Sequence, residues 1–285
     1  MMIFFIVFIL LLLQSSTVNT ASEDNSFPAV ELKALQDLYY NTKGPYWTWK
    51  QNGKKWNFTE VNPNPCYEQW QGIECTSNCL GSALCNVKNI SLVDYNLDGV
   101  LSSSIGDFHE LQWLNLRSNA INCPIPAEIG NLTKLIALDL SHNVLYSTVP
   151  ATIGELINLE VLSLTNNILS GNIPSSIGNL TNLQILQLSK NFFKGQIPQE
   201  IGNLHKLTIL DLVSIELSGT IPESLMKLKE LEDLTVNGYL SLAGNVFFGT
   251  VPRSIYHLPK LQWLNLEEIF YFSDNIPPDI GKLTE

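Results

Sequence analysis

One motif recurs about every 24 residues and dominates the chain from Val87 onward. The pattern is L-x-x-L-x-L-x-x-N-x-L-x-G-x-I-P-x-x-I-G-N-L-x-x. A unit of this length cannot bury its own apolar face, so neighbouring copies must stack to complete the core. We therefore expect an elongated solenoid over residues 87–285 that binds along one face. Its eight repeats begin at Val87, Leu111, Leu135, Leu159, Leu183, Leu207, Leu231 and Leu261.

Each repeat contains an x-L-x-L-x stretch whose period of two predicts a β-strand. Successive strands should pair in parallel, with leucines such as Leu114 and Leu116 pointing into the core. An asparagine then ends the strand, where its amide can bond backbone groups, including those of the next coil. The Gly and Pro of the G-x-I-P step predict a second turn. The asparagines are Asn119, Asn143, Asn167, Asn191 and Asn245, whereas Ile215 and Ile269 replace them in two later repeats.

The charge and the apolar N-terminal segment indicate which partners and which cellular compartment to expect. The net charge of −11 excludes nucleic acid as a partner, because phosphate binding needs a basic surface. Residues 3–13 are unbroken apolar, too few for the ~20 that span a bilayer. Residues 1–20 therefore predict a secretory signal peptide, with a signal anchor as the alternative. We expect a protein that is secreted or lies on the extracellular side of the plasma membrane.

The five cysteines fit that compartment. Four of them, Cys66, Cys75, Cys79 and Cys85, precede the repeats and favour disulfides over thiols in a secreted protein. Of the three possible pairings we expect Cys66–Cys75 and Cys79–Cys85. A zinc site is the alternative, although no histidine lies nearby. Cys123 is left over and should be a free thiol.

Residues 21–86 should form a cap over the open N-terminal end of the solenoid. A helix is expected to begin near Pro28 and to stop at Asn41–Gly44. Its apolar face should comprise Val30, Ala34, Leu35 and Leu38. The tryptophans Trp47, Trp49, Trp56 and Trp70 should pack inside the cap, with a ligand site as the alternative. No polar cap follows the last repeat, so we expect the protein to continue past Glu285 or to be a truncated copy.

The open face of the sheet is the candidate binding surface. With the first leucine of a repeat as position 1, positions 3, 5 and 7 point outward and position 8 flanks them. Position 3 is an apolar stripe of Trp113, Ala137, Val161, Ile185 and Ile209. Position 5 holds Asn115, Asp139, Ser163, Gln187 and Asp211, and position 7 holds Arg117, Ser141, Thr165, Ser189 and Val213. Position 8 holds Ser118, His142, Asn166, Lys190 and Ser214.

An apolar stripe beside polar columns suits a protein or peptide ligand. Trp113 and Arg117 are the strongest individual candidates, because interface hot spots favour these residue types. The alternative is that the position 3 side chains only pack against one another along their column. Four N-x-S/T sequons are also candidate glycan acceptors, at Asn57, Asn89, Asn131 and Asn179.

Two repeat runs, at residues 171–180 and 188–198, resemble plant-type extracellular leucine-rich repeat proteins. The string from Cys66 to Cys75 resembles the N-terminal domain that precedes such repeats, although residues 34–47 differ from the usual plant version. The resemblance implies an α/β fold: a right-handed leucine-rich repeat solenoid with a parallel sheet on the concave face and a disulfide-bonded cap. Similar proteins include receptor-like kinase ectodomains, receptor-like proteins and secreted polygalacturonase inhibitors. The chain has no kinase motif.

We therefore expect extracellular recognition of a protein, peptide or oligosaccharide, in cell-surface signalling or defence, with a membrane-anchored co-receptor as a possible partner. The alternative is a secreted inhibitor of a cell-wall hydrolase such as polygalacturonase. Ice binding would need a regular hydroxyl array, which Val213 interrupts. Catalysis would need a nucleophile beside the His142 and Asp139 pair, and none is evident. Neither a cofactor nor a metal is expected.

Overall fold

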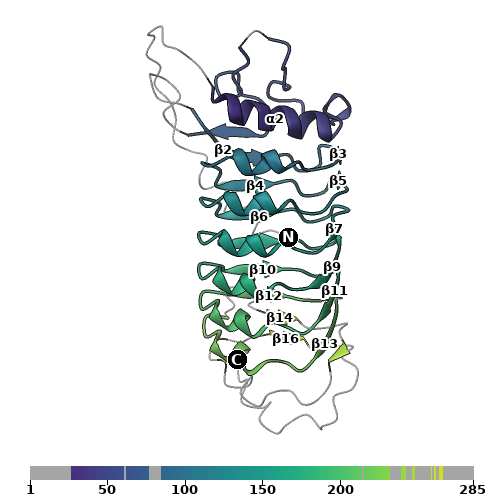
Figure 1. Cartoon of the computed structure of the whole chain (residues 1–285), viewed down its shortest axis with the longest axis vertical. Helices are drawn as coiled ribbons and strands as arrows, with labels where there is room; N and C mark the ends of the chain where they lie inside the picture. The colour runs from purple at the N-terminus through teal and green to yellow at the C-terminus, as the bar shows by residue number, and fades with distance from the viewer. Residues whose placement is uncertain are drawn as a thin grey trace.

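The chain winds into stacked coils with a helical cap across one end (Figure 1). The computed structural model describes residues 27–60, 62–76, 85–213 and 215–231, with 239–241, 246–247, 258, 260 and 263–265 of the later repeats. Residues 1–26, Cys79, Ser214, Asn245 and Ile269 lie outside the described residues. No helix of the described part is both long and apolar enough to cross a membrane.

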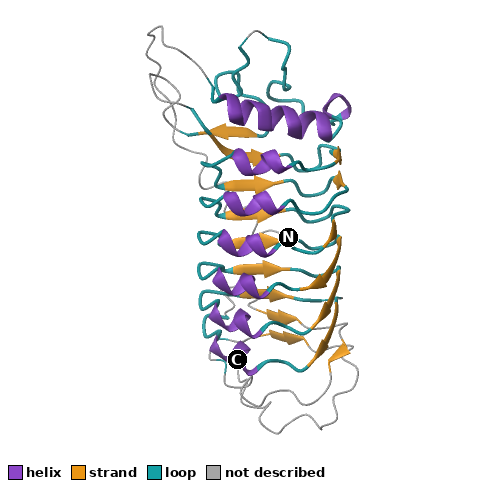
Figure 2. Cartoon of the chain, in the orientation of Figure 1, coloured by secondary structure: helices purple, strands orange, loops and turns teal. Residues whose placement is uncertain are grey.

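One strand from each of the eight coils joins a single sheet, as the sequence predicted, and a strand of the cap makes the sheet nine-stranded (Figure 2). Only the cap strand β1 is antiparallel to its neighbour β2. The other strands are parallel and pair one repeat apart, so Leu114 lies beside Leu138 and Asn115 beside Asp139. In sheet order the strands are β1 (Ile73–Cys75), β2 (Val87–Ser91), β4 (Trp113–Asn115), β6 (Ala137–Asp139), β8 (Val161–Ser163), β10 (Ile185–Gln187), β12 (Ile209–Asp211), β14 (Tyr239–Ser241) and β16 (Trp263–Asn265).

A second set of short strands lines one lateral side of the solenoid (Figure 2). The sequence predicted only a turn here, and that prediction was incomplete. Gly171, Gly195 and Gly219 lie in or at the end of these strands, and glycine favours a turn over a strand, so the sequence indicated a turn. They are β3 (Asp98–Gly99) and β5 (Ala120–Ile121) in one pair, and β7 (Tyr146–Ser147), β9 (Ile168–Asn172), β11 (Phe192–Gly195), β13 (Glu216–Gly219) and β15 (Val246–Phe247) in a five-stranded sheet.

Short 3₁₀ helices form the side opposite the main sheet, and each contains an I-G or L-M step of its repeat. Glycine is required in η3 because a Cβ on Gly130 would lie 2.6 Å from the carbonyl oxygen of Thr152 in the next coil. The helices can therefore stack at close spacing. They are η2 (Ser103–Asp107), η3 (Ala127–Asn131), η4 (Ala151–Glu155), η5 (Ser175–Asn179), η6 (Gln199–Asn203) and η7 (Glu223–Lys227).

The strand-ending asparagines form a ladder between coils. Asn143 donates to the carbonyls of Leu116 and Leu140 at 2.9 and 3.1 Å and accepts from the N–H of Ile121 at 3.1 Å. The predicted bond between coils is therefore present, but it reaches the preceding coil and not the next one. Asn119, Asn167 and Asn191 repeat this geometry. Ile215 is buried at the equivalent position and has no amide to offer.

The cap helix α2 (Ala29–Asn41) packs on the first coil and is followed by η1 (Gly44–Tyr46). Ala34, Leu35 and Leu38 are buried as predicted, but Val30 is 49% exposed. Glu31 is buried in its place and is bonded to the backbone N–H of Val87 at 2.7 Å. The helix is thus attached to β2 by a carboxylate as well as by apolar packing.

The tryptophans form an aromatic cluster in the cap, which confirms packing over a ligand site. Trp47, Trp56 and Trp70 are buried, and Trp49 packs against them half-buried. Their polar atoms are also used internally, because the Trp47 and Trp56 indoles donate to the carbonyls of Thr42 and Gln71 at 2.9 and 2.8 Å. Cys66 and Cys75 are bonded beside this cluster.

Candidate functional site

The position 3 side chains form one continuous row on the concave face of the main sheet. Register places each of them beside its counterpart in the next coil, from Trp113 through Ala137 to Ile209. All five members are half-buried, so each retains apolar surface. At the N-terminal end, the Lys88 ammonium lies 5.3 Å from the centre of the Trp113 ring. We call Trp113, Ala137, Val161, Ile185 and Ile209 the position 3 stripe.

The polar column at position 5 is partly committed to the fold. Its Asn and Asp side chains accept the backbone N–H two residues on, as at Asn115 (3.1 Å), Asp139 (2.9 Å) and Asp211 (3.2 Å). The column therefore fixes the end of each strand before it meets any ligand. Asn115, Gln187 and Asp211 remain half-buried, whereas Asp139 and Ser163 are buried.

Position 7 departs from its predicted exposure in a similar way. Ser141 and Ser189 are buried, because each hydroxyl donates to a neighbouring carboxylate: Ser141 to Asp139 at 2.6 Å and Ser189 to Asp211 at 2.8 Å. The Thr165 hydroxyl lies 3.1 Å from the Ser189 hydroxyl and so extends the hydrogen-bonded pair of Ser189 and Asp211. Burial raises the pKa of the Asp211 carboxyl above its ordinary range, against the hydrogen bonds that lower it. A ligand would therefore meet the larger side chains around these groups first.

Two cationic side chains, Arg117 at position 7 and Lys190 at position 8, lie at the ends of their strands. Arg117 is half-buried and Lys190 is exposed. His142 lies between their coils, and burial together with the nearby Arg117 lowers its pKa. The Nδ1 atom of His142 lies 3.1 Å from the amide of Asn166. Asp139 instead accepts from Ser141, so the arrangement does not orient His142 as a base through Asp139.

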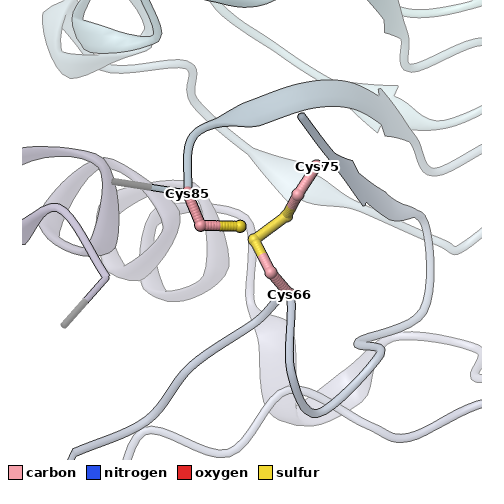
Figure 3. Close-up of side chains that lie close together, drawn as sticks. All are labelled: Cys66, Cys75 and Cys85. Atoms are coloured by element: carbon pink, nitrogen blue, oxygen red, sulfur yellow. A yellow bond between two sulfur atoms is a disulfide. The ribbon is translucent and has the colours of Figure 1, made fainter. Parts of the chain in front are cut away.

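The cap cysteines lie close enough to raise the question of a metal site (Figure 3). The sulfur atoms of Cys66, Cys75 and Cys85 all lie within 4.8 Å of one another. Cys66 and Cys75 form the predicted disulfide, and Cys85 is disulfide-bonded as well. Its predicted partner Cys79 lies outside the described residues. Metal binding by cysteine needs a thiolate, and the sulfurs of a disulfide are not thiolates. In their disulfide-bonded form these cysteines therefore cross-link the cap and do not ligate a metal. Cys123 is a buried free thiol, as predicted.

The sequons occupy different sides of the molecule. Asn131 and Asn179 are exposed at the ends of η3 and η5, away from the main sheet. Asn57 lies in the cap, where its side chain accepts the Thr59 hydroxyl at 2.7 Å. Asn89 differs, because β2 places it at position 3, in register with Trp113. Its amide donates to Glu74 of β1 at 2.5 Å, so it lies on the main sheet between Glu74 and Trp113.

Comparisons with known proteins agree with this architecture. Residues 82–195 match the family described as the leucine-rich repeat region. Over 77 residues the chain is 36% identical to a leucine-rich repeat receptor-like serine/threonine-protein kinase of Arabidopsis thaliana, which is 27% of this chain and 6% of the kinase. The structure of the plant peptide hormone receptor RGFR1 in complex with RGF2 matches 68% of this chain with 34% identity and a TM-score of 0.64. A plant ice-binding protein matches 87% of this chain and 73% of its own, with a TM-score of 0.71, but its 24% identity shows the fold alone.

The coils, the asparagine ladder and the parallel sheet define a leucine-rich repeat solenoid. Within that class, the chain resembles the ectodomains of plant receptor kinases. It spans 6% of the curated kinase that it matches and 30% of the RGFR1 chain.

Proposed function

We propose that this chain is an extracellular recognition module that binds a peptide or a protein segment on its concave sheet. The observation that carries the proposal is the position 3 stripe, which runs across five neighbouring strands and keeps part of its apolar surface exposed. Apolar surface flanked by hydrogen-bonding groups is typical of the centre of a protein interface. The likeness to a plant peptide hormone receptor supports a peptide as the ligand.

An extended peptide that runs along the solenoid axis fits the dimensions of this sheet. Eight parallel strands about 4.8 Å apart span roughly 34 Å, which an extended chain of about ten residues covers. The five strands β4, β6, β8, β10 and β12 would then each offer one side chain of the position 3 stripe and one polar group to the ligand. Trp113 and Arg117 would anchor the part of the ligand that lies over the N-terminal coils, as residue types that often dominate binding energy.

A module that recognises an extracellular ligand must be exported from the cell, so the proposal includes secretion. Residues 1–20 would direct secretion, residues 21–86 would cap the array, and residues 87–285 would supply eight repeats. Glycans would be attached at Asn57, Asn89, Asn131 and Asn179, and a membrane-anchored co-receptor would be a second partner. N-terminal sequencing of the secreted chain should begin at Ala21 or Ser22, and enzymatic deglycosylation should lower its mass. Retention of residues 1–20 would contradict this part.

The binding test uses the secreted full chain and a library of ten-residue peptides. We expect selected peptides to lose at least tenfold in affinity with Trp113→Ala or Ile185→Glu, since both substitutions change the position 3 stripe. Ile157→Glu is the matched control, because Ile157 is 56% exposed beside the 3₁₀ helices. Equal loss in all three variants, or no loss in any, would overturn the concave site.

The alternative function, inhibition of a cell-wall hydrolase, is tested by an enzyme assay. The purified chain can be titrated into polygalacturonase with a pectic substrate. Inhibition that saturates at one inhibitor per enzyme, together with no selected peptide, would favour a secreted inhibitor over a peptide receptor.

A further inference from the structure

Three basic side chains lie in a row just beyond the ends of the concave strands, across four neighbouring coils. Arg117 follows β4, His142 follows β6 and Lys190 follows β10. We call Arg117, His142 and Lys190 the basic row. Arg117 and His142 are half-buried and Lys190 is exposed, so all three can reach a ligand that lies on the sheet. The chain as a whole carries a net charge of −11, so this edge of the sheet differs in sign from the rest of the molecule.

The backbone gives the position 8 residues one repeated conformation. His142, Asn166 and Lys190 occupy this position in three successive coils, with φ values of +56°, +57° and +54°. Each backbone N–H donates to the carbonyl of position 7 in the next coil, as from His142 to Thr165 at 2.8 Å and from Lys190 to Val213 at 2.9 Å. Equal conformation and equal pairing project these side chains in the same direction. The contact of 3.1 Å between His142 Nδ1 and the Asn166 amide agrees with this alignment.

The acidic side chains near the basic row are already engaged within the protein. Asp139 is buried and accepts the N–H and the hydroxyl of Ser141 at 2.9 and 2.6 Å. Asp211 accepts a neighbouring hydroxyl at 2.8 Å, and burial raises the pKa of its carboxyl, which disfavours the charged form. Asp94, at position 8 of the first coil, is exposed but lies 3.8 Å from the Lys50 ammonium. A ligand at this edge of the sheet therefore meets mainly positive charge.

The basic groups, by contrast, are left available by the fold. Within the described part of the chain, neither Arg117 nor Lys190 forms an ion pair, whereas lysines elsewhere, such as Lys134, do. Burial lowers the pKa of His142 most, Arg117 and Lys190 lower it further, and Asp139 opposes them. The three basic groups are therefore close enough to repel one another when His142 is charged, and an anionic group of a ligand would relieve that repulsion.

We propose that the basic row binds acidic side chains of an extended peptide on the concave sheet. This inference rests on the proposed function and adds the class of ligand. The peptide backbone lies over the polar columns at positions 5 and 7, with apolar side chains toward the position 3 stripe and acidic side chains toward the basic row. Arg117 and Lys190 are three coils apart, roughly 14 Å along the axis. Residues four apart in an extended peptide lie on one side and are about 13 Å apart, which matches this spacing.

His142 makes this binding depend on pH. A bound carboxylate favours the charged imidazolium, so the pKa of His142 is higher in the complex than in the free chain, and binding takes up a proton. In the free chain this pKa lies below the ordinary 6.5. The affinity should therefore be highest below the pKa of the free chain, fall as the pH rises through the pKa of the complex, and level off above it.

Fluorescence anisotropy with the secreted full chain tests the inference, with two pools of labelled peptides of about ten residues. In one pool apolar residues alternate with glutamate, and in the other glutamine replaces every glutamate. Both pools are acetylated at the N-terminus and amidated at the C-terminus, so only side chains differ in charge. Near pH 5.5 the glutamate pool should bind at least about tenfold more tightly, as expected for several exposed ion pairs. Its advantage should shrink as the salt concentration rises.

Substitutions in the basic row assign the effect. Lys190→Asn and His142→Asn should each reduce the advantage of the glutamate pool by about threefold, the size of one exposed ion pair. Asparagine suits the backbone at this position, because Asn166 has the same conformation there. Lys227→Asn, on the exposed 3₁₀ side, removes the same charge and should leave the affinity within about twofold. His142→Asn should also remove the fall in affinity between about pH 5.5 and pH 8.

The outcomes separate this inference from the proposed function. Equal affinity for both pools, or a preference for glutamate that survives substitution of all three residues of the basic row, overturns the inference. The concave site then still stands if Trp113→Ala weakens both pools. A glutamine pool with free C-terminal carboxylates that binds as tightly as the amidated glutamate pool would also overturn recognition of acidic side chains. Absence of binding by every pool overturns both proposals.

Discussion

The side-chain amide of Asn167 donates to the carbonyl oxygen of Leu140, one coil earlier, at 3.0 Å. The same amide donates to Leu164 in its own coil at 3.0 Å, and the Asn167 carbonyl oxygen accepts from the N–H of Leu145 at 3.0 Å. A single buried side chain therefore satisfies backbone groups of two neighbouring coils. No apolar residue of similar size can do this.

Substitution of Asn167 by Leu should destabilise the fold by about 2–4 kcal/mol, because buried backbone groups lose their partners. Urea denaturation followed by circular dichroism measures the change. Asn203→Ala serves as the control, since Asn203 is exposed at the end of η6, and it should stay within about 0.5 kcal/mol. A loss below about 1 kcal/mol at Asn167 would contradict a structural role for the ladder.

Gly130 sets the spacing between neighbouring 3₁₀ helices. A Cβ there would lie 2.6 Å from the Thr152 carbonyl oxygen, so Gly130→Ala must push two coils apart. We expect a loss of about 1–3 kcal/mol in the free energy of unfolding. Ser175→Ala, on the exposed start of η5, should change it by less than about 0.5 kcal/mol. Equal effects would show that the contact is not tight.

Ser147 occupies a backbone conformation that suits glycine. Its φ is +69°, close to the +76° and +77° of Gly171 and Gly195 at the same position of later repeats. Ser147→Gly should raise the free energy of unfolding by about 0.5–1 kcal/mol, as relief of strain exceeds the added entropy of the unfolded chain. Ser147→Ala keeps a Cβ and should show no such gain. A loss of stability with glycine would exclude strain at this position.

Glu31 should make the stability of the cap depend on pH. Burial raises the pKa of its carboxyl above the ordinary 4.5, although hydrogen bonds from Val87 and Asn86 oppose the shift. The folded state then retains the proton to higher pH than the unfolded state does. Stability therefore falls as the pH rises from about 4.5 through the folded pKa, and levels off above it.

Glu31→Gln should remove this dependence, because glutamine does not titrate. Free energies of unfolding measured between about pH 4 and pH 7 should show the wild type losing stability relative to the variant as the pH rises. A difference between the two proteins that stays constant with pH would mean that Glu31 titrates alike in both states.

The regular part of the fold could be predicted because the same pattern of apolar residues recurs in each repeat. Leu114 and its counterparts recur at fixed spacing, which identifies the main strands, their parallel pairing and the core. The cap was predicted less completely. Apolar spacing suggested Val30 for the buried face, but the helix instead buries Glu31, whose partners Asn86 and Val87 lie 55 and 56 residues away.

The candidate site was predicted in outline for a similar reason. Alternation places positions 3, 5 and 7 on one face, but it does not say how deep a short side chain sits beside longer ones. Ser141 and Ser189 are small enough to be covered by their neighbours and to bond to Asp139 and Asp211. The lateral strands were missed because the glycine and proline of the G-x-I-P step indicate a turn.

The replacement of asparagine by isoleucine at residue 215 has a mechanical consequence. Each coil contacts only its neighbours, so a stack under tension separates first at the interface between coils that has the weakest interactions. The junction between the coils of Asn191 and Ile215 lacks the side-chain amide that bridges the preceding ones. If the two ends of this chain are pulled apart, we expect this junction to open before any of the junctions that precede it, leaving the cap and the earlier coils as an intact unit.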